Sequence, residues 1–362
     1  MNKKTNSWRI IGAIASKDIV DGIKNRTILI IIGGLLFFVL INMSLPLLLK
    51  ARQETRIVVY DAGESTLLTQ VGAGSELTFI NQASRDGMML YVGESMEAFL
   101  GVVIPEDFDT TLEAGEQVKI QGYAPRWADL DEIDDSANAL KTRVELLSNG
   151  EIVIDYQDNL VFPQPDSDGQ SFLISMGLTL ATVLVSIFIV PHLIIEEKET
   201  DTIKTLLISP ASISQMVMGK SLAGLTYGLV AGGMVLIFSR KMIVNWELAL
   251  LAILAGAFFA VALGLLFGTA FNDSQNLNIW LGIILVALIL PPFLVQTMSA
   301  KWPVFLQRIL PWSPTVSLSN LFRIAFSDQV PMNLVMTHFG VLLGSGVVLL
   351  AIVVLLVSRM DR

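Results

Sequence analysis

The sequence has no cysteine and only two histidines among its 362 residues. The first absence excludes disulfides, thiolate metal sites and cysteine nucleophiles, and the second leaves no zinc motif built on paired histidines. Charged residues are also scarce, at 16%, whereas soluble proteins average about 25%. Because 53% of the residues are hydrophobic, the composition indicates a membrane protein.

The few charges are unevenly distributed along the chain. Residues 50–169 contain 8 Lys and Arg but 23 Asp and Glu, a net charge of −15, whereas the rest of the chain has a net charge of +6. The basic residues outside this segment lie near the ends of apolar runs, so nucleic-acid binding is not expected. The sequence therefore predicts a membrane domain joined to an acidic aqueous domain, and excludes a single soluble globule.

Six apolar stretches are long enough to cross a bilayer as helices, which takes about 20 residues each. They are residues 27–49, 171–195, 217–238, 247–271, 277–298 and 335–358. Lys and Arg cluster before the first stretch, so the positive-inside rule places the N-terminus in the cytoplasm. An even number of spans returns the C-terminus to the same side. We therefore expect a multi-pass protein of the cell membrane, with both termini in the cytoplasm.

Two segments before the second span have patterns of their own. In residues 1–26, Trp8, Ile11 and later isoleucines recur at helical spacing, which predicts a cytoplasmic amphipathic helix lying on the inner leaflet. A polar N-terminal arm is the alternative. Residues 50–169 fall outside the cytoplasm in this topology, and their length is sufficient for an independent core.

The outer segment alternates strand and helix patterns. Apolar, β-branched runs predict strands at 56–61, 77–80, 98–105, 117–123 and 151–157. Between the last two, apolar residues recur every three or four positions over 127–147, which predicts a helix that stops at Asn149 and Gly150. Strands with helices between them indicate a small α/β domain.

The predicted spans contain essentially no ionisable residue at bilayer depth. His192 and His338 lie near span ends, where an interfacial position is the simpler interpretation. A proton-coupled carrier needs a carboxylate or histidine deeper in the bundle. The energy for any transport is therefore expected to come from another source.

Small residues follow a four-residue spacing in two of the spans. They are Gly224, Gly228 and Gly232 in the third span, and Ala252, Gly256, Ala260, Gly264 and Gly268 in the fourth. Small residues at this spacing let helix backbones approach closely. We interpret them as helix-packing positions and not as a ligand site.

The inner loop at 196–216 has an ordered pattern. It begins with the charged residues Glu196 to Glu199, continues with Ile203, Leu206 and Leu207 at helical spacing, and breaks at Pro210. This pattern predicts a short cytoplasmic helix that enters the next span through a turn. Such a helix is a natural docking element for a soluble partner.

This stretch resembles the inner loop of type-2 ABC exporter permeases, whose pattern is close to E-K-E-x-G-T, then L-L, a Ser/Thr-Pro step and G-K. The matching residues are Glu197, Lys198, Glu199, Thr202, Leu206, Leu207, Ser209, Pro210, Gly219 and Lys220, and Asp201 stands where glycine is usual. The order of segments is similar to that of the subgroup with sodium-efflux-type and multidrug-type permeases. The resemblance implies that these residues, together with Glu196, couple the chain to an ATPase.

The resemblance also implies a fold and a function. The expected fold is an all-α transmembrane domain of six helices with an inserted extracytoplasmic α/β domain. The expected function is that of the permease subunit of an ATP-driven exporter, which is not itself an enzyme. It holds no cofactor, because ATP and Mg would bind to a separate ATP-binding subunit, and it pairs with a second permease copy or a homologue. The outer loop at 299–334 would then contain short re-entrant helices, with a surface hairpin as the alternative.

Two other classes of protein remain open at this stage. In the first, the chain is a membrane-anchored receptor or scaffold whose outer domain binds a ligand or partner. In the second, it is a passive channel or ion-coupled carrier, which the lack of buried charge disfavours. The transported substrate, whether an ion, a drug or a lipid-like molecule, cannot be read from the sequence.

Overall fold

The computed structural model of the chain describes residues 3–24, 29–30, 33–34, 37, 55–72, 77–95, 98–148, 150–167, 169–200, 212–299 and 301–360. Most of the predicted first span, 27–49, and residues 201–211 of the inner loop therefore lie outside the described residues.

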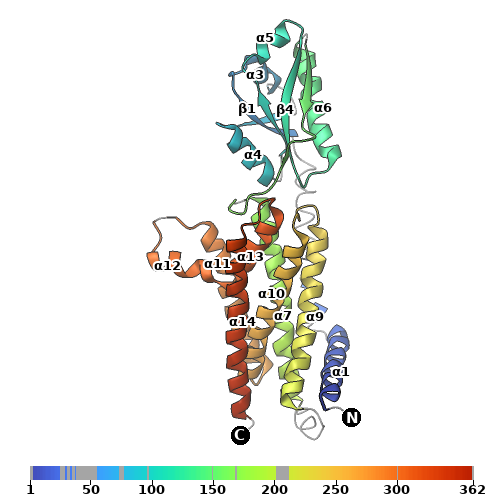
Figure 1. Cartoon of the computed structure of the whole chain (residues 1–362), viewed down its shortest axis with the longest axis vertical. Helices are drawn as coiled ribbons and strands as arrows, with labels where there is room; N and C mark the ends of the chain where they lie inside the picture. The colour runs from blue at the N-terminus through green and yellow to red at the C-terminus, as the bar shows by residue number, and fades with distance from the viewer. Residues whose placement is uncertain are drawn as a thin grey trace.

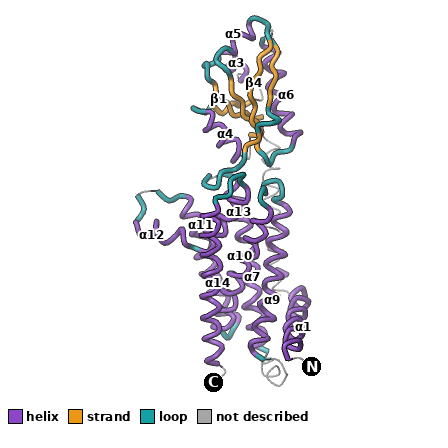
Figure 2. Tube along the Cα trace, in the orientation of Figure 1, coloured by secondary structure: helices purple, strands orange, loops and turns teal. Residues whose placement is uncertain are grey.

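The molecule is elongated and has two parts (Figure 1). A bundle of long helices carries an α/β domain at one end, and both chain termini lie at the other end. Strands are gathered in the α/β domain, whereas the described part of the bundle is helical (Figure 2). We call the end of the bundle next to the α/β domain the outer end, and the opposite end the inner end.

Five helices of the bundle are long and apolar enough to span a membrane. They are α7 (Gln170–Glu199), α9 (Ile213–Phe238), α10 (Trp246–Ala270), α11 (Ser274–Gln296) and α14 (Met332–Met360). Each overlaps one of the predicted spans from 171 onwards. The most apolar stretches of α7 and α10 are two-thirds buried, whereas those of α11 and α14 are mostly exposed. The bundle is therefore built around α7 and α10.

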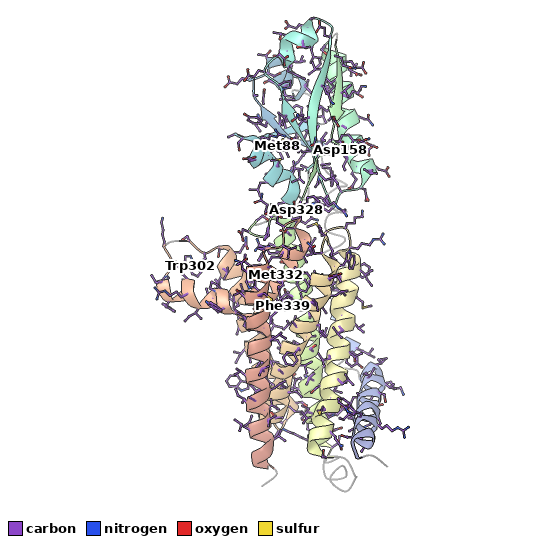
Figure 3. The ribbon with its side chains drawn as sticks, in the orientation of Figure 1. Met88, Asp158, Trp302, Asp328, Met332 and Phe339 are labelled. Carbon is purple, nitrogen blue, oxygen red and sulfur yellow. The ribbon has the colours of Figure 1, made fainter. Side chains whose placement is uncertain are left out.

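The outer loop between α11 and α14 contains helices of two kinds. α12 (Val304–Ile309) and η1 (Leu310–Trp312) project sideways from the bundle, and Trp302 lies at about the height of Met332 (Figures 1 and 3). By contrast, α13 (Pro314–Phe326) is buried along nearly its whole length and packs on α7, α10 and α14. The loop therefore differs from a plain surface hairpin, because α13 fills the outer end of the bundle core.

The N-terminal helix α1 (Lys3–Lys24) runs along α9 (Figure 1). Gln215 donates a hydrogen bond from Nε2 to Ser7 Oγ at 2.9 Å, and Tyr227 donates from its hydroxyl to the Ile19 carbonyl at 2.6 Å. These contacts advance in the same direction along both helices, so the two helices run in parallel. Packing against α9 therefore sets the direction of α1 in the bundle, and its position on the inner leaflet stays a prediction.

Glycines let α9 approach α7 closely. A Cβ atom on Gly224, Gly228 or Gly232 would collide with Val190 Cγ2, Ser186 Oγ or Thr182 Oγ1 of α7, respectively. Each step of four residues forward along α9 therefore matches four residues backward along α7, which is the register of an antiparallel pair. The hydroxyl of Ser186 also donates to the Gly224 carbonyl at 3.2 Å, as is common where helices cross closely in membranes.

The glycines of α10 face the same helix and α13. A Cβ on Gly264 would lie 3.0 Å from Val190 Cβ, one on Gly268 would lie 2.7 Å from Ile194 Cδ1, and one on Gly256 would lie 2.6 Å from Leu318 Cδ2. The step of four residues from Gly264 to Gly268 in α10 matches the step of four residues from Val190 to Ile194 in α7. The two helices therefore run in parallel. The small residues of both helices thus converge on α7.

The α/β domain is built on a mixed sheet of six strands. They are β1 (Thr55–Asp61), β2 (Leu77–Asn81), β3 (Ala98–Ile104), β4 (Gln117–Pro125), β5 (Glu151–Asp155) and β6 (Leu160–Val161). The order is β2-β1-β3-β4-β5, with β6 beside β4, and only the β3–β4 pair is antiparallel. The five strands predicted from the sequence are thus confirmed to within a few residues at their ends.

Helices cover both faces of this sheet. One face packs its core against α3 (Thr66–Gly72), α5 (Phe108–Glu113) and α6 (Leu130–Leu147), and the other packs against α4 (Arg85–Glu94). The predicted helix at 127–147 corresponds to α6, which begins at residue 130 after a capping box formed by Asp129 and Glu132.

Asp109 of α5 links two helices of the α/β domain. Its Oδ2 accepts hydrogen bonds from Thr66 N at 2.8 Å and Thr66 Oγ1 at 2.9 Å, and its Oδ1 accepts one from Ser65 Oγ. Burial raises the pKa of this carboxyl, but the hydrogen bonds outweigh burial, so that the pKa lies below its ordinary value of 3.8. The ionised form is therefore the one that the fold stabilises.

We expect Asp109→Asn to lower the thermal stability of the α/β domain at pH 7, by about 1–3 kcal/mol of unfolding free energy. Because the folded pKa is lowered, the contribution of the charge is complete above the unfolded pKa and is lost as pH falls below about 4. The stability difference between wild type and variant should therefore shrink on acidification. Asp107→Asn is the matched control, since the Asp107 side chain makes no capping hydrogen bond. A pH-independent difference would contradict the assignment.

Candidate functional site

Three consecutive residues at the inner end of α7 contact three other helices, and Lys220, the partner of the first, also contacts α1. Glu197, Lys198 and Glu199 point in different directions, because successive residues of an α-helix are rotated by about 100°. Together with Asp18 of α1 and Lys220 of α9 they form what we call the inner cluster. Only Thr200 separates the last turn of α7 from residues 201–211, which continue the inner loop.

Lys220 lies at the centre of a buried ion cluster. Its side chain is 1% exposed, and its Nζ lies 3.0 Å from Glu197 Oε1 and 3.3 Å from Asp18 Oδ2. The same ammonium donates to the Leu193 carbonyl at 2.9 Å. A charge removed from water at this depth is tolerated only when it is paired and hydrogen-bonded. The cluster therefore fixes α1, α7 and α9 to one another.

Lys198 joins α7 to the inner end of α10. Its Nζ donates to the carbonyls of Gly268 at 2.8 Å, Thr269 at 3.1 Å and Phe271 at 2.6 Å. The last carbonyls of a helix have no donor within the helix, and the helix dipole places partial negative charge there. An ammonium with three donors satisfies both requirements.

Glu199 joins α7 to the first turn of α11. Its two carboxylate oxygens accept from Ser274 N at 2.7 Å and from Ser274 Oγ at 3.0 Å. Negative charge is stabilised at a helix N-terminus, where backbone N–H groups lack partners. A second contact joins the same two helices further from the inner end, where His192 Nε2 of α7 lies 3.1 Å from Asn278 Oδ1 of α11. The inner end of α7 is therefore joined to α11 at two places.

Gly219 allows α1 to reach the inner cluster. A Cβ at this position would lie 2.6 Å from Ile14 Cγ2, so only glycine permits the observed approach of α1 to α9. Ile11 and Asp18 are buried at this contact, whereas Trp8 is 67% exposed. Asp18 therefore lies on the buried face of α1, where it pairs with Lys220.

The structure brings together only part of the predicted coupling set. Glu197, Lys198, Glu199, Gly219 and Lys220 lie at the inner end of α7 and α9, and Glu196 is exposed beside them. Thr202, Leu206, Leu207, Ser209 and Pro210 lie outside the described residues. Sequence reasoning missed Asp18 and the contacts that Lys198 and Glu199 make with the end of α10 and the start of α11. The signal for Asp18 was its spacing of seven residues from Ile11, which places both on one helix face.

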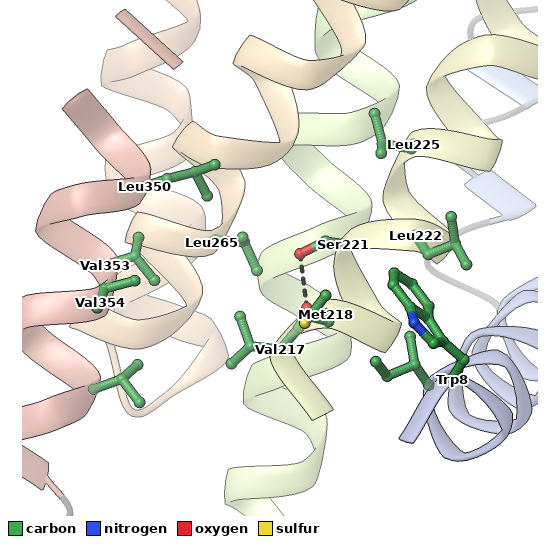
Figure 4. Close-up of a pocket in the computed structure, with 12 residues that line it drawn as sticks. Trp8, Val217, Met218, Ser221, Leu222, Leu225, Leu265, Leu350, Val353 and Val354 are labelled. Atoms are coloured by element: carbon green, nitrogen blue, oxygen red, sulfur yellow. Dashed lines mark hydrogen bonds between the residues drawn. The ribbon is translucent and has the colours of Figure 1, made fainter. Parts of the chain in front are cut away.

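An apolar cavity lies between α9 and α14 near the inner end (Figure 4). Its volume is about 600 Å³, and its walls include Val217, Leu222, Leu265 and Val354. Among the described residues that line it, only Ser221 supplies a hydroxyl, which donates to the Val217 carbonyl at 2.7 Å and is therefore already satisfied. Among the described residues, no group of three or more His, Cys, Asp or Glu could hold a metal ion.

These features define a multi-pass membrane protein whose helices are tied together by charged residues at one end of the bundle. The sequence matches the family model described as ABC-2 family transporter protein over residues 26–355. The chain belongs to this family, whose members are the membrane permease subunits of ABC transporters and normally work with an ATP-binding subunit. No curated protein is significantly similar to the chain.

Proposed function

We propose that this permease subunit belongs to an exporter, in which ATP hydrolysis by a separate subunit moves a substrate out of the cytoplasm by alternating access. The observation that carries the proposal is the inner cluster. Three consecutive residues of α7 contact α9, α10 and α11, and Lys220 of α9 links them to α1. These contacts lie directly before the segment that the resemblance assigns to ATPase docking. A force applied to that segment would reach four helices through short charged contacts.

The arrangement of the two parts supports the proposed topology. The α/β domain lies at the outer end of the bundle, and both termini lie at the inner end (Figure 1). Basic residues flank the termini, and the positive-inside rule places such ends in the cytoplasm. The α/β domain is then extracytoplasmic, and residues 201–211 face the cytoplasm, where an ATPase would dock. Two copies of the chain, or the chain and a homologue, would form the complete membrane unit.

The apolar cavity supports a lipophilic or amphipathic substrate. Its walls contain no ionisable side chain among the described residues, and its one hydroxyl is satisfied within α9. Apolar pockets with few polar groups favour apolar ligands, since burial of apolar surface drives their binding. An inorganic ion would find few ligands there.

We expect Glu199→Lys to uncouple the permease from its ATPase. The new ammonium would face Ser274 N–H at the positive end of the α11 dipole, and two charge-assisted hydrogen bonds would be lost. ATP hydrolysis by the purified complex should fall by about tenfold or more, which corresponds to about 1.4 kcal/mol. The measurement uses tagged chain purified from its native membrane together with the bound ATPase.

Glu247→Lys is the matched control, because Glu247 is an exposed acid in the first turn of α10 at the outer end. We expect it to leave ATP hydrolysis within twofold of wild type. Wild-type chain that purifies without a stoichiometric ATPase would overturn the exporter proposal and favour a receptor or scaffold. If the ATPase is present and Glu199→Lys hydrolyses ATP normally, the coupling role of the inner cluster is wrong.

A further inference from the structure

The outer end of α7 is held by a carboxylate from the α/β domain. Glu94, the last residue of α4, is 9% exposed. Its Oε2 accepts from Ser171 N at 3.1 Å, and both of its oxygens lie 2.9 Å from Ser171 Oγ. Its Oε1 also accepts from Gln164 N at 3.2 Å and from Ser167 Oγ. The carboxylate thus pairs with one of the backbone N–H groups that α7 leaves unsatisfied at its start, that of Ser171.

The backbones of Gly169 and Glu94 are in close contact. A Cβ on Gly169, the residue before α7, would lie 2.5 Å from Glu94 Cβ and 2.6 Å from the Glu94 carbonyl oxygen. Glycine is therefore required for the close approach of the two backbones. Trp127 adds a second attachment, because its Nε1 donates to the Gly93 carbonyl at 3.2 Å while its side chain packs against the bundle core.

The helices α11 and α13 of the bundle bind the segment before α7 from the side opposite Glu94. Arg323 of α13 is 6% exposed, and its guanidinium donates to the Ser167 carbonyl from Nη2 and to Gln296 Oε1 from Nη1 at 3.0 Å. Gln296, at the end of α11, donates to the same carbonyl at 3.3 Å. The Arg323 guanidinium also lies 5.8 Å from the centre of the Phe172 ring. Residues 164–167 and 169–172 are therefore held between α4 on one side and α11 and α13 on the other.

We propose that Glu94 is a positioning residue that fixes the α/β domain to the outer ends of α7 and α13, so that the domain follows every movement of these helices. Among the described residues, Lys241 and Asp129 form another polar contact between the two parts. This ion pair is about half exposed on both sides, and exposed ion pairs contribute little. Glu94 therefore provides the rigid attachment, because its hydrogen bonds are shielded from water.

The consequence for transport rests on the proposed function. α7 carries the inner cluster at one end and the Glu94 attachment at the other, and its 30 residues form one helix with a length of about 45 Å. A displacement that an ATPase imposes on the inner end would therefore move the α/β domain. The domain is then a moving part of the transport cycle, and not a passive receptor tethered to the bundle.

The attachment can be measured with spin labels in the full-length chain in lipid nanodiscs. Because the chain has no cysteine, labels attach only at introduced positions. Leu146→Cys in α6 and Glu247→Cys in α10 place one label on each part, both at exposed sites. We expect a narrow distance distribution in the wild-type background, and at least a doubling of its width with Glu94→Ala. Glu94→Gln should give an intermediate width, since the amide keeps one acceptor oxygen.

Lys241→Ala is the matched control, because it removes the exposed contact between the same two parts. It should leave the distribution unchanged. A second label pair at Leu90 and Leu146, both within the α/β domain, should stay narrow in every variant and reports that the domain is folded. If Glu94→Ala broadens the distances within the α/β domain, the variant Ser171→Ala is used in its place, because Ser171 lies outside the domain. Ser171→Ala should then broaden the distance distribution between the two parts.

A narrow distribution in a folded Glu94→Ala variant, or equal broadening with Lys241→Ala, would overturn the proposal. The experiment requires neither an ATPase nor a substrate. Its failure is therefore distinguishable from failure of the proposed exporter function, which depends on the co-purified ATPase.

Discussion

Gly228→Leu is expected to prevent the chain from accumulating as a folded monodisperse protein. A Cβ at Gly228 would collide with Ser186 Oγ of α7, and would lie 3.2 Å from Ala257 Cβ of α10 and 3.4 Å from the Thr182 carbonyl oxygen. Three helices meet at this point, so none can move away without disturbing the others. Overpacking of a close-packed core typically costs about 1–3 kcal/mol, and a leucine here adds four carbons where none fits. The recovery of monodisperse protein in detergent, measured by size-exclusion chromatography, should fall at least fivefold.

Gly233→Leu is the matched control for this prediction. Gly233 lies in the same helix five residues further on, and a Cβ there meets no atom within 4 Å. The same increase in apolar volume should therefore leave recovery and melting temperature close to those of wild type. Equal losses for both variants would show that leucine at either position acts through helix insertion or expression, and that close packing on α7 is not the cause.

Lys220→Met is expected to cause the largest loss of stability at the inner end. Methionine has nearly the length of lysine but leaves Glu197 and Asp18 buried beside each other without a counter-charge. Removing one partner of a buried ion pair typically costs about 3–5 kcal/mol. The melting temperature should fall, and α1 should become sensitive to proteases because the contact that holds it to α9 is lost. Lys17→Met, at an exposed position of α1, should have little effect.

A compensating variant separates the electrostatic cause from a general packing defect. Combining Lys220→Met with Asp18→Asn and Glu197→Gln removes the three charges of the buried ion pairs around Lys220 and nearly preserves their volume. Since replacing a complete buried ion cluster by neutral groups is often close to neutral, we expect most of the lost stability to return. A triple variant as unstable as the single one would contradict this explanation.

The strands of the α/β domain were predictable because their information is local. Runs such as 56–61 and 98–105 combine β-branched residues with turn residues at both ends, and the same runs are strands in the structure. Their order in the sheet was not predictable, since β1 lies between β2 and β3. Pairing depends on contacts between residues far apart in the chain, and no periodicity within a strand reports them.

The sequence predicted some residues of the inner cluster but not the groups that they contact. Glu197, Lys198 and Lys220 were identified by their resemblance to a family pattern, but their partners were not. Asp18 lies 202 residues before Lys220 in the chain, and an acid on an amphipathic helix is normally read as solvent-facing. The carbonyls that Lys198 binds carry no sequence signal, because every residue has one.

The sequence by itself determined that the chain spans a membrane, where most of its apolar helices begin and end, and that small residues form stripes on two of them. Only the tertiary structure decided that both stripes face α7, that α1 runs along α9 and that α13 fills the outer end of the bundle. The physical reason is that hydrophobic length and periodicity describe one helix relative to its own axis. Which neighbour occupies a given face is decided by packing and by the pairing of buried charges.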